Sequence, residues 1–455
     1  MSKRFFETYI SVVRKVLPSP YTIAVLLTII ALLGVFTFGN FNELSSSEIL
    51  DSWASGLWEP NLMVFAMQMM LILVLGNVLA LSPAVEKIIQ KLVIPCTNSA
   101  NSAALISLTA MLVGLFNWGL GLVFGAILAR KVGKKAKFEN RKLNYGLIGA
   151  AGYSALLIWH GGISGSSLIK VAESGHLNSL TDGKYSSIIP DSISLNETVF
   201  SSLNIWVSIA LLIVVPAVLY GIGKLTEGEV PAFTRAHDTT VESEQLIGAE
   251  KLDHSGIFSK SIGIGVLFYC FYLMYAKGGV LSFFTPNNIN FLLLGLCLLS
   301  HKHIVGFIGA TDNAIRGASG ILIQFPLYFG ILALMQSSGL IEAFSNFIID
   351  HSSPLSFPLF TFFSAGLVNL FVPSGGGQWA IQGPIIIQSS LELGIPLNKS
   401  ILALAYGDEV TNMLQPFWAL PLLGITQLSA RDILPYTLVM FLTASSIFIL
   451  GLLSI

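Results

Sequence analysis

The most informative stretch of this sequence for the fold is "VNLFVPSGGGQWAIQGP", which runs from Val368 to Pro384. The stretch lies inside a long apolar segment, yet a proline, three consecutive glycines and a glutamine interrupt its centre. In hydrocarbon, each unpaired N–H or C=O group costs several kcal/mol, so loosened backbone is tolerated only when it is buried in protein or lines a wet cavity. The stretch therefore predicts a cavity built at membrane depth.

The composition places this stretch in a membrane protein. Of 455 residues, 53% are hydrophobic and only 11% are charged, which is outside the range of soluble globular domains. A net charge of -1 argues against a nucleic-acid partner, because such binding needs a basic face. Cys96, Cys270 and Cys297 have neither CxxC nor Cys/His spacing, so they predict no disulfide framework and no zinc site.

Apolar stretches long enough to cross a bilayer of about 30 Å recur along the chain. They lie near 21–38, 61–82, 200–223, 261–277, 287–300, 318–338 and 433–454. Other apolar segments are broken by polar residues and glycines: 102–129 at "NWGLG", 144–172 at "WHGGISGS", 355–391 at the opening stretch and 398–426 at "TNMLQP". The chain is therefore expected to be an all-α polytopic membrane protein.

The distribution of Lys and Arg predicts the orientation. Basic residues in the leader, 1–20, hold the N-terminus in the cytoplasm, whereas the loop after the first span is acidic and lies outside. Basic residues flank the segment 102–129 on both sides, so both of its ends are cytoplasmic. A segment that enters and leaves on one side is a re-entrant hairpin.

The chain divides into two similar halves around a polar linker. Residues 21–223 and 261–455 are each predicted to contain, in this order, a span, a hairpin, a broken span and a second span. The two halves have opposite orientations in the membrane, and the mixed-charge segment 224–260 is a cytoplasmic linker between them. The hairpins are 102–129 and 355–391. Inverted repeats of this kind are typical of secondary transporters, whose sites lie at the repeat interface near mid-membrane.

The breaks supply the candidate substrate site. Glycines let backbone approach a ligand, and the helix that starts near Gly376 directs its N–H groups and positive dipole end toward an anion. Hydroxyl and amide side chains at the other breaks add further contacts. The predicted substrate-binding residues are Asn117, Trp118, Gly119, Gly121, His160, Gly161, Gly162, Ser164, Ser166, Ser374, Gly375, Gly376, Gly377, Gln378, Trp379 and Gln382.

A coupling cation is expected close by. Asp408 lies about one turn before Asn412, so it can bind a proton or complete a sodium site made of Asp408, Thr411 and Asn412. The full predicted set for the coupling ion is Asn117, Ser374, Asp408, Thr411, Asn412 and Gln415. No Lys or Arg lies at mid-depth, which favours a small monoanion over a dicarboxylate. We expect no other cofactor.

Other interpretations compete with this one. Glycines such as those in "GLGLVFGAILA" also serve close helix packing, Trp118 and Trp379 can be packing residues, and His160 can be a neutral histidine bonded to backbone. The chain could be a passive anion channel. "YGDE" is similar to motifs of intramembrane aspartyl proteases, but that chemistry needs two facing aspartates and only Asp408 lies at this depth. We therefore expect no enzyme.

Six motifs resemble those of the short-chain fatty acid transporter family of the AtoE type, within the ion transporter superfamily. They are "GLWEPNLMVFAMQMMLILVLGNVLA", "NWGLGLVFGA", "GGISGS", "GILIQFPLYFGI", "FVPSGGGQWAIQGP" and "AYGDEVTNMLQPFWALP". The resemblance implies a homodimer that imports acetoacetate, butyrate or similar acids with protons or sodium, moving a transport domain past a scaffold in an elevator. It assigns Ser374–Gln378 to one tip, Asn117–Gly119 to the other, and Asn412–Pro416 to the second break.

Two positions depart from the family pattern. His160 stands where the family leads us to expect glycine, and Asp408–Glu409 stands where one acid followed by a polar residue is expected. Both departures concern ionisable groups. They therefore bear on the identity of the coupling ion and, through it, on the substrate.

Overall fold

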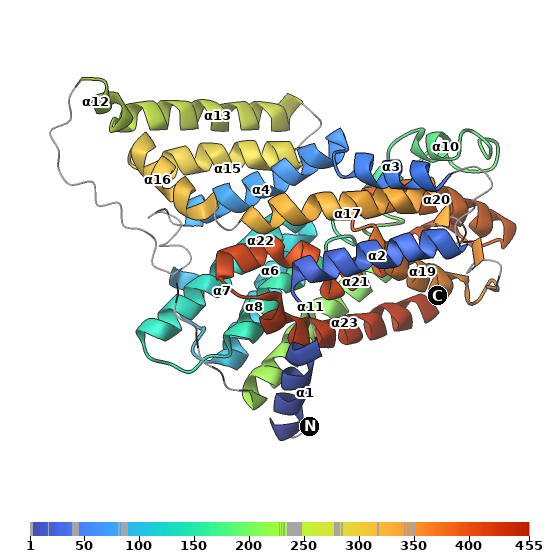
Figure 1. Ribbon diagram of the computed structural model, residues 1–455, viewed down its shortest axis with the longest axis horizontal. Coiled ribbons are helices and arrows are strands. Elements are labelled where there is room, and N and C mark those ends of the chain that lie inside the picture. Colours follow the sequence, from blue (N-terminus) through green and yellow to red (C-terminus); the bar gives the residue numbers. More distant parts are fainter. Residues whose placement is uncertain are drawn as a thin grey trace.

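All regular structure in the described part of the chain is helical (Figure 1). The computed structural model describes residues 3–16, 18–38, 45–80, 82, 90–226, 228, 230, 233, 248–276, 283, 285–315, 318–340, 343, 346–347 and 351–454. Seven described segments are long and apolar enough to cross a membrane: Pro20–Thr37, Ser47–Leu79, Ser99–Phe116, Ser202–Leu225, Gly256–Ala276, Ser319–Ser337 and Ala430–Leu453. The expected all-α, multi-span fold is confirmed.

The uninterrupted apolar runs form continuous helices, because backbone groups in hydrocarbon must pair within their own segment. These helices are α2 (Pro20–Phe38), α4 (Pro60–Ala80), α11 (Ser202–Leu225), α13 (Gly256–Ala276), α15 (Pro286–Ser300), α17 (Ser319–Ser337) and α23 (Ala430–Leu453). Their bounds lie close to the predicted stretches. α15 falls among the shorter apolar helices and is not one of the seven candidate spans.

Two described helices longer than two turns lie outside the predicted leader, apolar spans and broken segments. α3 (Ser46–Gly56) starts at a capping box, in which the Ser45 N–H donates to Glu48 Oε2 at 2.7 Å and the Ser45 side chain accepts from the Glu48 N–H. The S-x-x-E spacing that marks such a start is present in the sequence. The other is α16 (Ile304–Ile315), which packs against α4.

Each predicted hairpin is a pair of helices joined by a short break. The first consists of α6 (Ser99–Phe116) and α7 (Trp118–Phe138), and the second of α19 (Phe357–Phe371) and α20 (Gly375–Glu392). Asn117 and Ser374 have extended backbone, with φ of -157° and -152°, which ends one helix and starts the next. The breaks lie at the two predicted tips.

The two predicted broken spans are also broken. In the first, α8 (Tyr145–Tyr153) tightens into η1 (Ser154–Leu157), and a turn-rich stretch leads to the short α9 (Ser166–Lys170). In the second, α21 (Leu397–Thr411) tightens into η3 (Asn412–Leu414) before α22 (Pro416–Thr426). Proline has no N–H to give to a preceding turn, so Pro416 is placed at a helix start.

The helices pack in an order that leaves the breaks in the interior. Figure 1 shows α13 and α15 along one side with α4 and α16, while α6–α8, α11 and α23 lie on the other and α17 lies between. The remaining helices are α1 (Lys3–Val16), which contacts α23, and the short α10 (His176–Leu180) and α12 (Glu250–Asp253). Most of 227–247, within the predicted linker 224–260, lies outside the described residues.

Candidate functional site

The second hairpin tip presents free backbone donors. The Gly377 N–H donates to Ser374 Oγ at 3.2 Å, and the Gln378 N–H donates to the Ser374 carbonyl at 2.7 Å. Within the described residues, the N–H groups of Gly375 and Gly376 have no hydrogen-bond partner. A Cβ added to Gly376 would meet nothing within 4 Å, so open space adjoins these donors. Two adjacent N–H groups at the positive end of a helix suit the two oxygens of a carboxylate.

The first hairpin tip has fewer donors to offer. The Leu120 N–H donates to Asn117 Oδ1 at 2.9 Å, and the Trp118 N–H donates to Ser164 Oγ at 3.1 Å. Of the first three N–H groups of α7, only that of Gly119 lacks a partner within the described residues. The second tip therefore has more unpartnered backbone donors than the first.

Indole rings connect the two tips. The rings of Trp118 and Trp159 have centroids 6.1 Å apart, and those of Trp118 and Trp418 are 5.1 Å apart, both in edge-on arrangements. A Cβ on Gly375 would lie 3.0 Å from Cη2 of Trp159. The first tip, the first break and the second tip thus share one aromatic wall.

A buried cluster of ionisable groups lies against the second tip. His160 Nδ1 and Asp408 Oδ2 are 2.5 Å apart, and the His160 backbone N–H donates to Glu409 Oε2 at 2.9 Å. These side chains are at most 1% exposed. A Cβ on Gly375 would lie 3.0 Å from Asp408 Oδ2 and 3.1 Å from His160 Cε1. A ligand held by the α20 N-terminus would therefore lie next to Asp408.

The oxygens predicted to bind sodium converge on an amide nitrogen. Asn369 Nδ2 lies 2.6 Å from the Asp408 carbonyl, 2.9 Å from Thr411 Oγ1 and 3.0 Å from Asn412 Oδ1. The Gln415 side chain donates a hydrogen bond from Nε2 to the Asn369 carbonyl. A cation site needs acceptor oxygens around open space, and here a hydrogen-bond donor fills the point of convergence. This donor set does not fit sodium in the conformation observed.

Three predicted residues of α20 hold the helix in place. Gln378 Nε2 donates to the Ala365 carbonyl of α19 at 2.8 Å, and Gln382 Nε2 donates to Ser364 Oγ at 3.1 Å. Trp379 is 2% exposed, and its Nε1–H donates to His176 Nε2 at 2.9 Å. These side chains lie along the shaft of the hairpin and away from the two free N–H groups at its tip.

Three predicted glycines serve close packing. A Cβ on Gly121 would lie 2.7 Å from the Cα of Gly114, and one on Gly162 would lie 2.2 Å from the Leu115 carbonyl oxygen. Gly161 is likewise enclosed by a neighbouring side chain. At these three positions the structure agrees with the alternative interpretation, in which the glycines allow close packing of neighbouring segments. Ser166, the first residue of α9, is half-buried.

Five residues of this region were not among the predicted site residues. They are Trp159, Ser167, Asn369, Glu409 and Trp418, all of which are nine-tenths or more buried. Ser167 donates its backbone N–H to His160 Nε2 at 3.2 Å. The sequence could have identified Asn369, because burying an amide side chain in an apolar helix one turn before a tip is unfavourable unless the amide has hydrogen-bond partners. Nothing local distinguishes the two tryptophans from packing residues.

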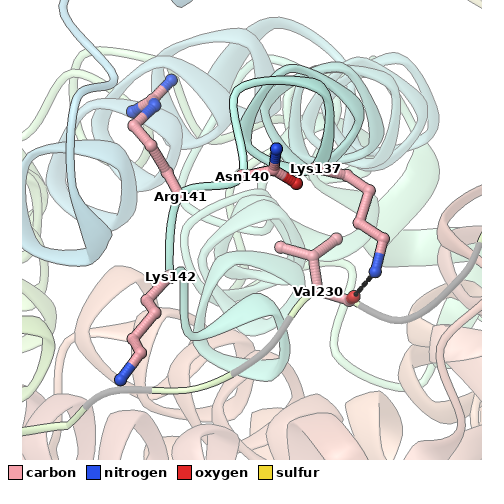
Figure 2. Close-up of a pocket in the computed structure, with 5 residues that line it drawn as sticks. All are labelled: Lys137, Asn140, Arg141, Lys142 and Val230. Carbon is pink, nitrogen blue, oxygen red and sulfur yellow. Dashed lines mark hydrogen bonds between the residues drawn. The ribbon is translucent and has the colours of Figure 1, made fainter.

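A surface pocket of about 240 Å³ lies elsewhere, at the end of α7 (Figure 2). Two of its cations already have partners: Lys137 Nζ donates to the Val230 carbonyl, and Arg141 bonds to Glu139 and to the carbonyl groups of 96 and 97. In Figure 2 the side chains of Arg141 and Lys142 point apart. This pocket is separate from the hairpin tips.

Comparison with known proteins agrees with the motifs. A model of the short chain fatty acid transporter family matches residues 1–455. A protein of Haemophilus influenzae named for short-chain fatty acid transport is 35% identical, over 99% of this chain and 98% of that protein. A protein of Escherichia coli with the same name is 33% identical over 99% of this chain and 98% of its own length.

Two solved structures are distantly similar. The YdaH transporter of Alcanivorax borkumensis has a TM-score of 0.41 and 15% identity, covering 96% of this chain and 98% of its own. MtrF of Neisseria gonorrhoeae has a TM-score of 0.39 and 13% identity, covering 99% of this chain and 96% of its own. On the whole-chain family match and the two relatives, this multi-span membrane protein belongs to the short-chain fatty acid transporter family.

Proposed function

We propose that this protein is a secondary active transporter that carries short-chain monocarboxylates of the acetoacetate and butyrate type across the bacterial inner membrane. The observation that carries the proposal is the pair of unpartnered N–H groups of Gly375 and Gly376, with open space beside Gly376. Family membership supports the substrate class.

The surroundings of the tip favour a small acid with one charge. The indole rings of Trp118, Trp159 and Trp418 offer an apolar wall of the size of a short acyl chain. The Nε1–H groups of Trp159 and Trp418 are buried and have no partner within the described residues, so they can serve an additional acceptor such as a keto group. The neighbouring Asp408 would repel a second carboxylate on the substrate.

The transport cycle is part of the proposal. The hairpins α6–α7 and α19–α20 would be re-entrant, the halves 21–223 and 261–455 would be inverted repeats, and the N-terminus would lie in the cytoplasm. A homodimer working as an elevator would expose the tips to one side at a time. The matching order of hairpin and broken span in both halves supports this arrangement.

Transport is tested with purified protein in liposomes. Counterflow of labelled butyrate, acetoacetate and a C4 dicarboxylate, under separate proton and sodium gradients, would show saturable exchange of the monocarboxylates. A passive anion channel would give flux without gradient-driven accumulation. A preference for the dicarboxylate would contradict the proposed substrate class.

The anion site is tested by one matched pair of variants. Gly376→Pro removes a free N–H, and proline is tolerated in the first turn of a helix; Gly376→Ala keeps the N–H, and its Cβ enters open space. A hydrogen bond to a charged group contributes about 1.5–3 kcal/mol, so Gly376→Pro should raise the KM for butyrate counterflow about 10-fold or more. Gly376→Ala should stay near the natural protein. Equal KM values for the two variants would contradict the site.

A further inference from the structure

We propose that the coupling ion is a proton, held by the two carboxyl groups of Asp408 and Glu409 beside a neutral His160. This inference rests on the proposed transport of a carboxylate. It goes further in assigning the cation and the groups that bind it.

Hydrogen bonding fixes the state of His160. The Ser167 backbone N–H can only donate, and it points at His160 Nε2 from 3.2 Å; the Ser167 hydroxyl lies 3.0 Å from the same nitrogen and can donate to it as well. Nε2 therefore accepts and carries no proton. The ring proton is therefore on Nδ1, which donates to Asp408 Oδ2. Forming an imidazolium would cost the Ser167 hydrogen bond, so the groups free to take up a proton are the two carboxyls.

The charge balance of the cluster calls for a cation. The Glu409 carboxyl accepts backbone N–H groups of His160 and Gly161, and Asp408 Oδ2 accepts the imidazole N–H, but the described residues show no Lys or Arg paired with either acid. Two adjacent ionised carboxylates with almost no exposure are expensive without a compensating charge. A proton is the smallest charge that can enter.

The other ionisable groups near α21 are neutral or peripheral. Tyr406 donates its hydroxyl to Asn204 Oδ1, and Tyr153 donates its hydroxyl to the Asn412 carbonyl. The charged side chains on α21 and on the described elements packed against it lie toward helix ends; they are Lys170, Glu392, Lys399, Arg431 and Asp432. The charge on the cluster is therefore set by its own protons.

Sodium is the alternative cation, and the three residues predicted to form its site, Asp408, Thr411 and Asn412, already have oxygens in contact with a hydrogen-bond donor. The Asp408 carbonyl, Thr411 Oγ1 and Asn412 Oδ1 all surround Asn369 Nδ2, which donates to them. The carboxylate of Asp408 faces His160 instead. A proton needs no such cage of oxygens.

The same geometry couples the proton to the substrate. Asp408 Oδ2 is 3.0 Å from where a Gly375 Cβ would lie, so an anion bound to the tip would be close to the cluster. An unprotonated cluster with two carboxylates repels the anion, which weakens anion binding; one added proton neutralises one of the two carboxylates and reduces the repulsion. By linkage, the bound anion raises proton affinity and the proton raises anion affinity by the same factor. Acid and proton then move together.

The test measures protons taken up on binding. Butyrate is titrated into the purified full-length protein by calorimetry in two buffers of different ionisation enthalpy, with sodium present or replaced by choline. The natural protein should take up a proton with each butyrate. Its affinity should fall about tenfold for each pH unit above the range in which the cluster loses that proton, with no dependence on sodium.

Variants identify the groups. Asp408→Asn and Glu409→Gln should each lower the proton uptake, and the double variant should bind butyrate with no proton uptake and no pH dependence. Glu392→Gln, an exposed acid on α20, is the control and should match the natural protein. If the double variant does not fold, the two single variants decide the question.

Two kinds of failure are distinguishable. Binding of butyrate without proton uptake, binding that requires sodium, or unchanged uptake in both single variants would overturn the proton assignment and leave the transporter proposal standing. Absence of any butyrate binding to the folded natural protein would overturn the proposed function, and the inference with it.

Discussion

Single residues at the hairpin tips set what this site can bind. Ser374 and Asn117 occupy equivalent places, each capping the helix that follows, yet they leave different numbers of donors. At the first tip a hydroxyl from Ser164 takes the Trp118 N–H, whereas the Gly375 and Gly376 N–H groups remain free at the second. One hydroxyl thus accounts for the difference in the number of free N–H groups between two otherwise similar turns.

A residue-scale prediction concerns His176, on α10 outside the candidate spans. Burial, together with nearby Lys170, lowers the pKa of His176 below its ordinary value of 6.5. The folded protein therefore prefers the neutral ring, whose Nε2 accepts the Trp379 N–H. This contribution to stability is complete above the ordinary pKa and is lost as pH falls from there through the lower folded value.

Thermal unfolding checks this. The midpoint of the natural protein should fall between neutral pH and about pH 5 more steeply than that of His176→Gln, whose amide oxygen can accept the same hydrogen bond at any pH. Parallel pH profiles for the two proteins would show that the ring does not titrate in this contact.

At the scale of elements, glycines determine how closely helix α7 of the first hairpin packs against helix α8 of the first broken span. A Cβ on Gly125 of α7 would lie 2.3 Å from the Gly152 carbonyl of α8, and a Cβ on Gly152 would lie 2.7 Å from the Gly125 carbonyl. The two backbones are in direct contact, as small residues allow in membrane helices. This contact sets α7 and its tip against the break that carries His160.

Gly125→Ala should therefore separate α7 from α8 and lower the thermal stability of the purified protein. A clash with backbone cannot be relieved by a rotamer change, and overpacking of this kind costs about 1–3 kcal/mol. Gly221→Ala in α11 is the matched control, because its Cβ would meet nothing within 4 Å. It should be neutral or slightly stabilising, since alanine is the better helix former. Equal stability of the two variants would refute the close contact.

At the scale of the whole molecule, the helices bring the breaks of both halves to one interior region. Trp159 from the first half lies against Gly375 from the second, and His160 from the first is bonded to Asp408 from the second. Neither half alone contains the cluster. In an alternating-access cycle, this region would open to one side of the membrane at a time.

Thiol labelling tests that opening. Gly376→Cys keeps the backbone N–H and places its thiol in open space, while the native Cys96, Cys270 and Cys297 are buried. We expect a water-soluble maleimide to modify Gly376→Cys and butyrate to slow the reaction at least severalfold. Ser454→Cys, at an exposed position near the C-terminus, should be unaffected by butyrate. No protection at Gly376→Cys would place the substrate elsewhere.

The sequence by itself determined the membrane class, the long apolar helices and the places where helices break. These features follow from local chemistry: hydrophobic length sets spans, and Pro373 and Pro416 lie where helices break, because proline has no N–H to give to a preceding turn. The amphipathic α3 was missed although its capping box is legible, and α16 was missed because its apolar run is too short to signal a span.

Only the tertiary structure decided which polar groups are free and which are engaged. The Asn369 side chain donates to oxygens that were predicted to bind sodium, and Ser167 fixes the tautomer of His160. Gly121 and Gly162 serve close packing. Asn369 is distant in sequence from the oxygens it contacts, the two glycines pack where helix segments meet, and the Ser167 contact depends on how the turn-rich stretch after η1 folds. Hydrogen bonds form only between atoms that lie a few ångströms apart, and the local sequence does not specify which distant segments come within that distance.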